Sequence, residues 1–222
     1  VFVNHRSAVC HTSDLSEAAL RRFVRDTIEL SQLSEPDDLN ELPARSELIL
    51  PGQQLLDLDL WDDQTARLTA PELFDIASRM EAAALGYSTR ITNSDGASCD
   101  RNAGYLALAL CDKSGLAFSG ASRGTYCSFN VEALCDDEGG KKRNGYHWTG
   151  GRKLDQLLTP EAVGREAAHR AVRTLGSVKI DTGVYPVVFE REAAGAILGL
   201  LVSCILGDSV YREQSYLGAR LG

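Results

Sequence analysis

Residues 187–212 read VVFEREAAGAILGLLVSCILGDSVYR, and this stretch decides which fold the chain is expected to adopt. Glu190 and Glu192 place negative charge where a helix N-terminus favours it, so a helix is predicted to follow. From Ala193 to Leu206 every residue is Ala, Gly, Ile, Leu, Val, Ser or Cys, which predicts a helix that is apolar on all sides and buried in a core. Gly207 is predicted to end this helix. About 14 residues fall short of the roughly 20 that cross a bilayer, so no membrane span is expected.

Three stretches before this one are also predicted helices. Each opens with a capping residue, and each has an acidic residue or a proline in its first turn. Apolar residues then recur at helical spacing. The three helices are opened by Asp14 with Glu17, by Thr69 with Glu72, and by Thr159 with Pro160 and Glu161, and the last two are predicted to end at Gly86 and Gly176.

An antiparallel sheet is predicted between the second and third of these helices. Residues 93–96, NSDG, are interpreted as a turn between two strands, while residues 112–115 and 136–142 have the Gly and Asp content of hairpin connections. Strands grouped between helices, without regular βαβ alternation, predict an α+β fold. The predicted strands are residues 87–92, 105–111, 116–122, 125–134 and 144–149, with a further short one at 187–189.

The charge pattern suggests several domains. Residues 31–75 hold eleven acidic and two basic side chains, whereas the whole chain of 222 residues has a net charge of −8. Proline and charged residues without a sustained period predict a surface linker at residues 34–53. We expect a multi-domain chain that is a fragment of a longer protein. Its expected parts are the end of an N-terminal α/β domain at 1–34, an acidic linker at 35–66, a central α+β domain at 67–178 and the start of a C-terminal domain at 183–222.

Acidic side chains repel phosphate, so the local acidity predicts no direct contact with nucleic acid, which would require clustered Lys and Arg. The acidic stretch is interpreted as a solvated linker and helix face, with a docking patch for a basic partner as the alternative. Six cysteines are present without a C-x-x-C pair, and no histidine has zinc-finger spacing. These cysteines are interpreted as structural thiols of a cytoplasmic protein.

Three stretches together carry a family resemblance: RITNSDGAS at 90–98, the apolar helix, and GDSVYR at 207–212. With them the chain resembles the TldD/PmbA family, long called modulators of DNA gyrase and understood as a two-subunit metalloprotease system. The likeness is greatest to the PmbA/TldE branch. In the TldD branch the corresponding helix carries H-E-x-x-x-H, whose histidines hold a metal while the Glu can act on its bound water. Those three positions are Gly199, Leu200 and Cys204 here.

Gly199 and Leu200 offer a metal no lone pair, and Cys204 alone supplies one ligand where a catalytic zinc needs three. The resemblance therefore implies a subunit with no catalytic residue and no metal of its own, inactive alone, and zinc in a TldD-like partner. Polar residues in the two most specific stretches of the resemblance, residues 91–96 and 207–212, are candidates for a substrate-channel or interface role. They are Asn93, Asp95, Asp208, Ser209, Tyr211 and Arg212.

The leading hypothesis is therefore a non-catalytic subunit that pairs with a TldD-like metalloprotease subunit and helps to enclose peptides or unfolded segments. A homodimer remains open as a second kind of assembly. One alternative is that the chain is itself a peptidase, with a metal site elsewhere or with Cys204 as nucleophile. Another is a regulator that binds gyrase, whose basic surface the acidic segment could contact.

Overall fold

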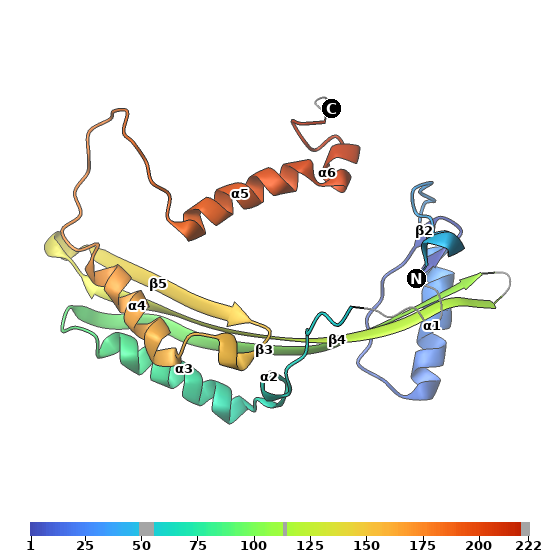
Figure 1. Ribbon diagram of the computed structural model, residues 1–222, viewed down its shortest axis with the longest axis horizontal. Helices are drawn as coiled ribbons and strands as arrows, with labels where there is room; N and C mark the ends of the chain where they lie inside the picture. Colours follow the sequence, from blue (N-terminus) through green and yellow to red (C-terminus); the bar gives the residue numbers. More distant parts are fainter. Residues whose placement is uncertain (49–55, 113–114, 219–222) are drawn as a thin grey trace. The chain divides into compact units, whose positions relative to one another are not determined.

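The computed structural model describes residues 1–48, 56–112 and 115–218. The chain forms two compact units, Val1–Gly176 and Ser177–Gly222, which are described separately below. Figure 1 shows the order of the elements.

The first unit is built on an antiparallel sheet with the strand order β3-β4-β5. β3 and β4 pair along almost their whole length, whereas β5 pairs only with the half of β4 that runs from Cys127 to Asp136. The strands are β3 (Ile91–Asp112), β4 (Gly115–Asp136) and β5 (Lys142–Gly151). An antiparallel sheet with helices confirms the predicted α+β fold. The predicted connection at 136–142 joins paired strands and contains the 3-10 turn Glu138–Gly140. The predicted connection at 112–115 also joins paired strands, but residues 113–114 lie outside the described residues.

The prediction that residues 93–96 form a turn is wrong, because they lie inside β3. The strand accommodates them with two register shifts, between Ile91 and Asn93 and between Ser94 and Gly96. Ser94 Oγ accepts a hydrogen bond from Gly96 N at 2.9 Å, and Gly96 adopts a φ of 111°, which favours glycine. A bulge of this kind bends a strand without ending it. The strands predicted as separate segments are therefore joined into two strands of 22 residues each.

Two helices, α3 (Ala70–Leu85) and α4 (Pro160–Val172), pack on one face of the sheet and against each other (Figure 1). Their predicted N-termini are confirmed. Glu72 Oε2 accepts hydrogen bonds from Thr69 N at 2.8 Å and from Thr69 Oγ1 at 2.7 Å. Thr159 Oγ1 accepts one from Ala162 N at 3.3 Å. Helix α4 ends before Gly176, and tighter turns connect it to that glycine.

The core lies between this face of the sheet and the two helices. Inward-facing residues alternate along β4 from Cys127 to Cys135, as expected for a strand with one buried face. Two glycines allow close approach of the layers. A Cβ at Gly145 of β5 would lie 2.1 Å from the Ala171 nitrogen of α4, and one at Gly164 of α4 would lie 2.2 Å from the Met80 oxygen of α3. The other main core residues are Phe129, Val131, Ala133, Ala84, Val163, Ala167 and Ala168.

The first unit begins with a two-residue hairpin and a helix whose start differs from the prediction. The pair Asp14 and Glu17 does not cap this helix, because the N-cap is Ser16 and Asp14 Oδ1 accepts its hydrogen bond from Ser16 N at 3.0 Å. Asp14 thus stabilises the turn before the helix. The elements are β1 (Phe2–Val3), β2 (Arg6–Ser7), α1 (Glu17–Ser31), the 3-10 turn Arg45–Glu47, α2 (Asp63–Arg67) and, after β5, the 3-10 turn Leu154–Gln156.

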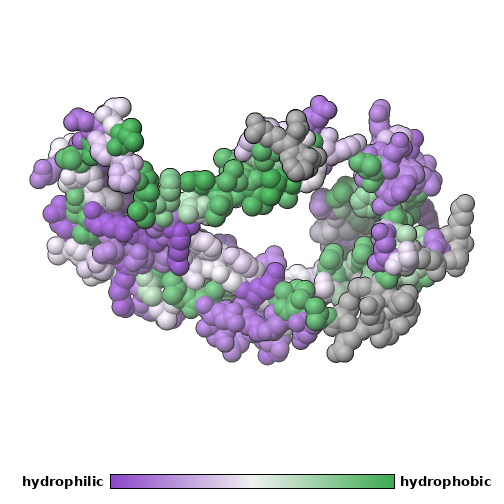
Figure 2. Space-filling model, turned by 45° about the horizontal axis from the view of Figure 1, so that its top comes forward, coloured by the Kyte–Doolittle hydropathy of each residue, from purple (hydrophilic) through white to green (hydrophobic). Residues whose placement is uncertain are grey.

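The second unit contains α5 (Arg191–Ile205) and α6 (Gly207–Tyr211). Gly207 was predicted to end the apolar helix but begins α6, with Leu206 as the residue between the two helices. Residues 187–189 form no strand. The prediction that the apolar helix is buried is wrong for this chain, since α5 has no buried residue and its hydrophobic side chains are visible in Figure 2. None of the described helices combines the length and hydrophobicity that crossing a bilayer requires.

Candidate functional site

Gly199, Leu200 and Cys204, the three positions that the resemblance aligns with the metal motif of the TldD branch, lie on α5. Glu190 caps this helix by accepting a hydrogen bond from Glu192 N at 2.8 Å, so the local start signal read from the sequence holds. A Cβ at Gly199 would have no neighbour within 4 Å, and the Leu200 side chain is 67% exposed. Cys204 is half-buried, and its backbone oxygen accepts a hydrogen bond from Ser215 Oγ at 2.5 Å.

These residues do not fit a zinc ion, the metal that the TldD branch implies. Gly199 has no side chain, Leu200 has no donor atom, and a single thiol at Cys204 leaves a catalytic zinc two protein ligands short. Within the described ranges, no group of three or more His, Cys, Asp or Glu side chains could hold a metal ion.

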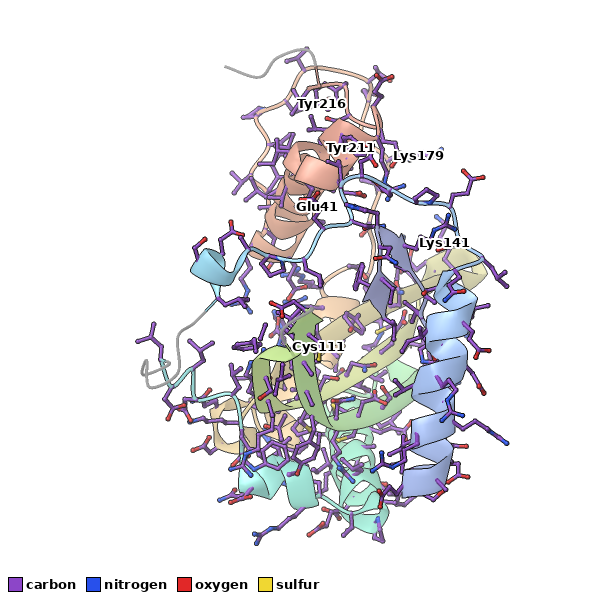
Figure 3. All side chains as sticks on the ribbon, turned by 90° about the vertical axis from the view of Figure 1, so that its right-hand side faces the viewer. Glu41, Cys111, Lys141, Lys179, Tyr211 and Tyr216 are labelled. Carbon is purple, nitrogen blue, oxygen red and sulfur yellow. The ribbon has the colours of Figure 1, made fainter. Side chains whose placement is uncertain are left out.

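The residues predicted after the motif lie on α6 and at its end. Arg212 Nε donates to Asp208 Oδ1 at 2.8 Å, which joins two candidate residues on one face of the short helix. The Ser209 oxygen accepts a hydrogen bond from Gln214 N at 2.9 Å and so fixes the turn that follows. The Tyr211 ring is 62% exposed (Figure 3). These contacts hold the backbone locally and leave the tyrosine accessible.

Asn93 and Asp95 lie on β3 rather than in a turn. Asn93 is opposite Leu134 of β4, whereas Asp95 falls within the second register shift, between Ser94 and Gly96. Both side chains are exposed. The structure thus places Asn93 and Asp95 on one strand of the first unit. In the second unit it pairs Asp208 of α6 with Arg212, the residue that follows this helix.

An aromatic contact at the middle of the long strands was not predicted from the sequence. Trp61, from the stretch interpreted as a linker, packs against Tyr105 with ring centroids 5.3 Å apart. Arg123 of β4 pairs with Tyr105 of β3. Its guanidinium lies 4.6 Å from the centre of the Trp61 ring. Leu60 O accepts a hydrogen bond from Thr125 N at 2.9 Å beside them. The one feature of the sequence that could have indicated this contact is a tryptophan in an otherwise acidic stretch.

Two carboxylates that join distant segments were also missed. Asp62 accepts hydrogen bonds from the Thr65 hydroxyl and from the Gln64, Thr65 and Leu154 amides, and these lower its pKa to about 2. Asp137 accepts from Arg143 Nε at 2.7 Å and from the backbone N–H groups of Glu138 and Gly176. The side-chain hydrogen bond from Arg143 is the main cause that lowers the pKa of Asp137 to about 2.

The fold and the motif helix define a domain pair of a metallopeptidase family. The sequence profile of the PmbA/TldA metallopeptidase central domain matches residues 63–175, and that of the C-terminal domain matches residues 182–222. The chain belongs to the PmbA/TldD metallopeptidase family, which confirms the resemblance read from its sequence.

Individual relatives agree with this assignment. The chain is 32% identical over 228 residues to metalloprotease PmbA of Escherichia coli O157:H7 and 29% identical to a PmbA homolog of Haemophilus influenzae. Each match covers 100% of this chain and 47% of the relative, so the chain spans about half the length of these relatives.

Two crystal structures named for modulators of DNA gyrase have the same fold. One, from Bacteroides thetaiotaomicron, matches with a TM-score of 0.78 at 22% identity, over 98% of this chain and 48% of that one. The other, from Thermotoga maritima, matches with a TM-score of 0.73 at 18% identity, over 95% of this chain and 45% of that one.

Proposed function

We propose that this chain belongs to a non-catalytic subunit of a two-subunit metalloprotease, in which a TldD-like partner supplies the zinc and the chemistry. The observation that carries the proposal is the residue set at the motif positions of α5, Gly199, Leu200 and Cys204. A metalloprotease needs the metal to polarise a peptide carbonyl and to lower the pKa of its bound water. This helix has no ligand set for that ion.

The exposed surface of α5 supports the role of a subunit that works by association. Leu198, Leu200 and Val202 are 59%, 67% and 52% exposed, and exposed apolar surface of this extent is typical of a surface that another polypeptide covers. Charged and polar groups follow at α6, where Asp208, Ser209, Tyr211 and Arg212 are proposed to contact the partner or the peptide.

The proposed site of action is the cytoplasm, and the proposed substrate is a peptide or unfolded segment enclosed between the subunits. All six cysteines are free thiols in the structure, and unpaired cysteines are common where the compartment is reducing. The names of the curated relatives, which describe metalloproteases, support a role in proteolysis.

The test is metal analysis of the purified chain together with a peptide-cleavage assay on the chain alone, on a TldD-like subunit alone and on the mixture. We expect substoichiometric zinc in this chain, no cleavage by it alone, and faster cleavage by the mixture than by the TldD-like subunit alone. One tightly bound zinc per chain, lost in the Cys204→Ala variant, with cleavage by the chain alone would instead support the alternative of an intrinsic peptidase.

A further inference from the structure

Two of the six cysteines are neighbours on the buried face of the sheet. In the register of β3 and β4, strands that Figure 1 shows side by side, Cys99 is opposite Phe129. Cys127 is the next residue of β4 that points to the same face, because side chains two positions apart share a face of a strand. Cys127 belongs to the core of the first unit, and Cys99 packs against that core.

The two side chains lean toward each other. Diagonal neighbours on antiparallel strands have Cα atoms roughly 7–8 Å apart, which is within reach of side chains that point along the diagonal. The Cys99 thiol donates a hydrogen bond to the Cys127 sulfur, so the two sulfur atoms are in contact. Cys111 and Cys135, the other cysteines of these strands, are opposite residues that have no thiol. Contact between two thiols therefore distinguishes Cys99 and Cys127.

The surroundings of this pair favour one thiolate. The hydrogen bond from Cys99 is the main cause that lowers the pKa of the Cys127 thiol, against the opposing effects of burial and of Asp100. Arg101, which is opposite Cys127 in the register, lowers this pKa as well. The hydrogen bond to Cys127 is the main cause that raises the pKa of the Cys99 thiol. The pair thus loses its first proton more readily than its second, and a thiolate is the form that reacts with oxidants.

Only one side of the pair faces solvent. Cys127 is completely buried, whereas Cys99 is half-buried, so a small reagent reaches the pair at Cys99. In a hydrogen-bonded thiol and thiolate the shared proton can move to the Cys127 sulfur and leave the thiolate on Cys99. A reactive thiolate beside a second thiol is the arrangement in which an oxidised sulfur is trapped as a disulfide.

We propose that Cys99 and Cys127 form a reversible disulfide when the protein meets a hydroperoxide. The Cys99 thiolate attacks one oxygen of hydrogen peroxide, so that an S–O bond forms, the O–O bond breaks and hydroxide leaves. This hydroxide takes the proton of Cys127 and becomes water. The Cys127 thiolate then attacks the Cys99 sulfur, the S–O bond breaks, and the second hydroxide takes a proton from solvent. The two sulfurs together lose two electrons, and the peroxide is reduced to two water molecules.

The position of the pair favours a bond that is easily reduced. A relaxed disulfide has Cβ atoms about 3.5–4.5 Å apart, which is closer than diagonal neighbours on two strands usually lie. The strands must approach each other to close the bond, and a disulfide held in strained geometry is more readily reduced. The bond would join β3 to β4 where β5 ends, since Cys127 pairs with Gly151. The proposal goes beyond the proposed function, because it concerns the oxidation of thiols and not cleavage.

Peptide mapping without reductant tests the proposal on the 222-residue chain, after treatment with hydrogen peroxide and alkylation of the remaining thiols. Trypsin releases Cys99 in the peptide 91–101 and Cys127 in the peptide 124–141, which also contains Cys135. We expect these two peptides to be linked and the number of free thiols to fall from six to four. Reduced glutathione should then separate the peptides and restore all six thiols.

Cys135→Ala is the matched control, because Cys135 is also completely buried on β4 but has no thiol opposite it. The linked peptides should persist in this variant, which assigns the bond to Cys127. In Cys127→Ala the link should be lost, and Cys99 should remain as a sulfenic acid that dimedone labels. Melting curves of the reduced variants show whether each is folded when peroxide is added.

Three results would overturn the proposal. The first is that peroxide oxidises other cysteines of the folded chain while Cys99 and Cys127 stay reduced. The second is that the peptides 91–101 and 124–141 remain linked in Cys127→Ala, which would assign the bond to Cys135. The third is that the link forms only in urea, where the strands no longer hold the two thiols together. A link in the native chain that reduced glutathione leaves intact would contradict its reversibility.

Discussion

Two glycines of this chain, Gly145 and Gly195, lie in opposite packing environments. A Cβ at Gly145 would lie 2.1 Å from Ala171 N and 2.3 Å from Ala167 O, both backbone atoms of α4 that cannot move independently of the helix. We expect Gly145→Ala to destabilise the first unit by about 2–4 kcal/mol, at or above the usual range for overpacking. Denaturant unfolding measures the change in free energy.

Gly195→Ala is the matched control. This glycine lies in the interior of α5, and a Cβ there would meet nothing within 4 Å. Alanine should therefore stabilise α5 by roughly 0.5–1 kcal/mol, because it restricts the unfolded chain more than glycine does. Equal effects of the two substitutions would contradict the close approach of β5 and α4.

Asp137 should make stability depend on pH. Its pKa is lowered from the ordinary value of 3.8 to about 2, first by the Arg143 hydrogen bond and then by the amides of Glu138 and Gly176. A lowered pKa in the folded state contributes stability above pH 3.8, and this contribution is lost as the pH falls through about 2. The melting temperature of Asp137→Asn should be below that of wild type at pH 7 and should change less between pH 4 and pH 2.

Asp38→Asn is a suitable comparison for this measurement, because Asp38 is exposed on the surface of the first unit. It should leave the pH profile of the melting temperature as it is in wild type. If Asp137→Asn has the wild-type profile as well, Asp137 does not join β5 to the end of α4 in solution.

At the scale of elements, Trp61 is expected to stabilise the part of the β3–β4 hairpin that has no pairing with β5, residues 104–112 and 115–124, which we call the ribbon. Trp61→Ala removes the ring contact with Tyr105 and the stacking of Arg123, and we expect a loss of about 1–2.5 kcal/mol in local stability. Amide hydrogen exchange at residues 104–112 and 115–124 should become faster, while exchange in the core half of β4 stays unchanged.

Phe74→Ala removes an aromatic ring of similar size that is 74% exposed on α3. Exchange in the ribbon should then match wild type. If the amides of the ribbon also exchange at the wild-type rate in Trp61→Ala, the stability of the ribbon does not depend on the Trp61 contact.

Local signals in the sequence predicted where the elements begin. Thr69 with Glu72 and Thr159 cap the helices that they were expected to cap, because these hydrogen bonds involve residues only three positions apart. Local signals could not predict that β3 and β4 are long continuous strands. NSDG has the composition of a turn, but pairing with β4 keeps residues 93–96 inside a strand, with a bulge at Gly96. The Asp137 contact with Gly176 spans 39 positions and leaves no local signal.

At the motif positions, too, the sequence predicts the identities of the residues but not how their helix is packed. The identities of Gly199, Leu200 and Cys204 follow directly from an alignment on the turn before Tyr211, and so does their lack of metal ligands. The exposure of α5 could not be predicted from its composition, because an apolar helix is buried only where another segment packs against it. Composition predicted burial in a core and gave no information on which segment would cover the helix.

For the molecule as a whole, the two units should differ widely in local stability. The first unit has a core of β4, α3 and α4 side chains, several of them completely buried. In the second unit neither α5 nor α6 contains a buried residue. Opening of a segment costs little free energy when it buries few apolar side chains, so the amides of 191–205 should exchange at least about tenfold faster than those of 127–135.

Hydrogen exchange followed by mass spectrometry measures both segments in one sample, and adding a TldD-like subunit then tests the proposed role. If α5 lies against that partner, the amides of 191–205 should become protected while those of 127–135 keep their rates, because the core is already closed. A TldD-like subunit that does not bind α5 would leave both rates unchanged. Protection of α5 equal to that of the β4 core in the chain alone would mean that this helix needs no partner, contrary to its exposed apolar side chains.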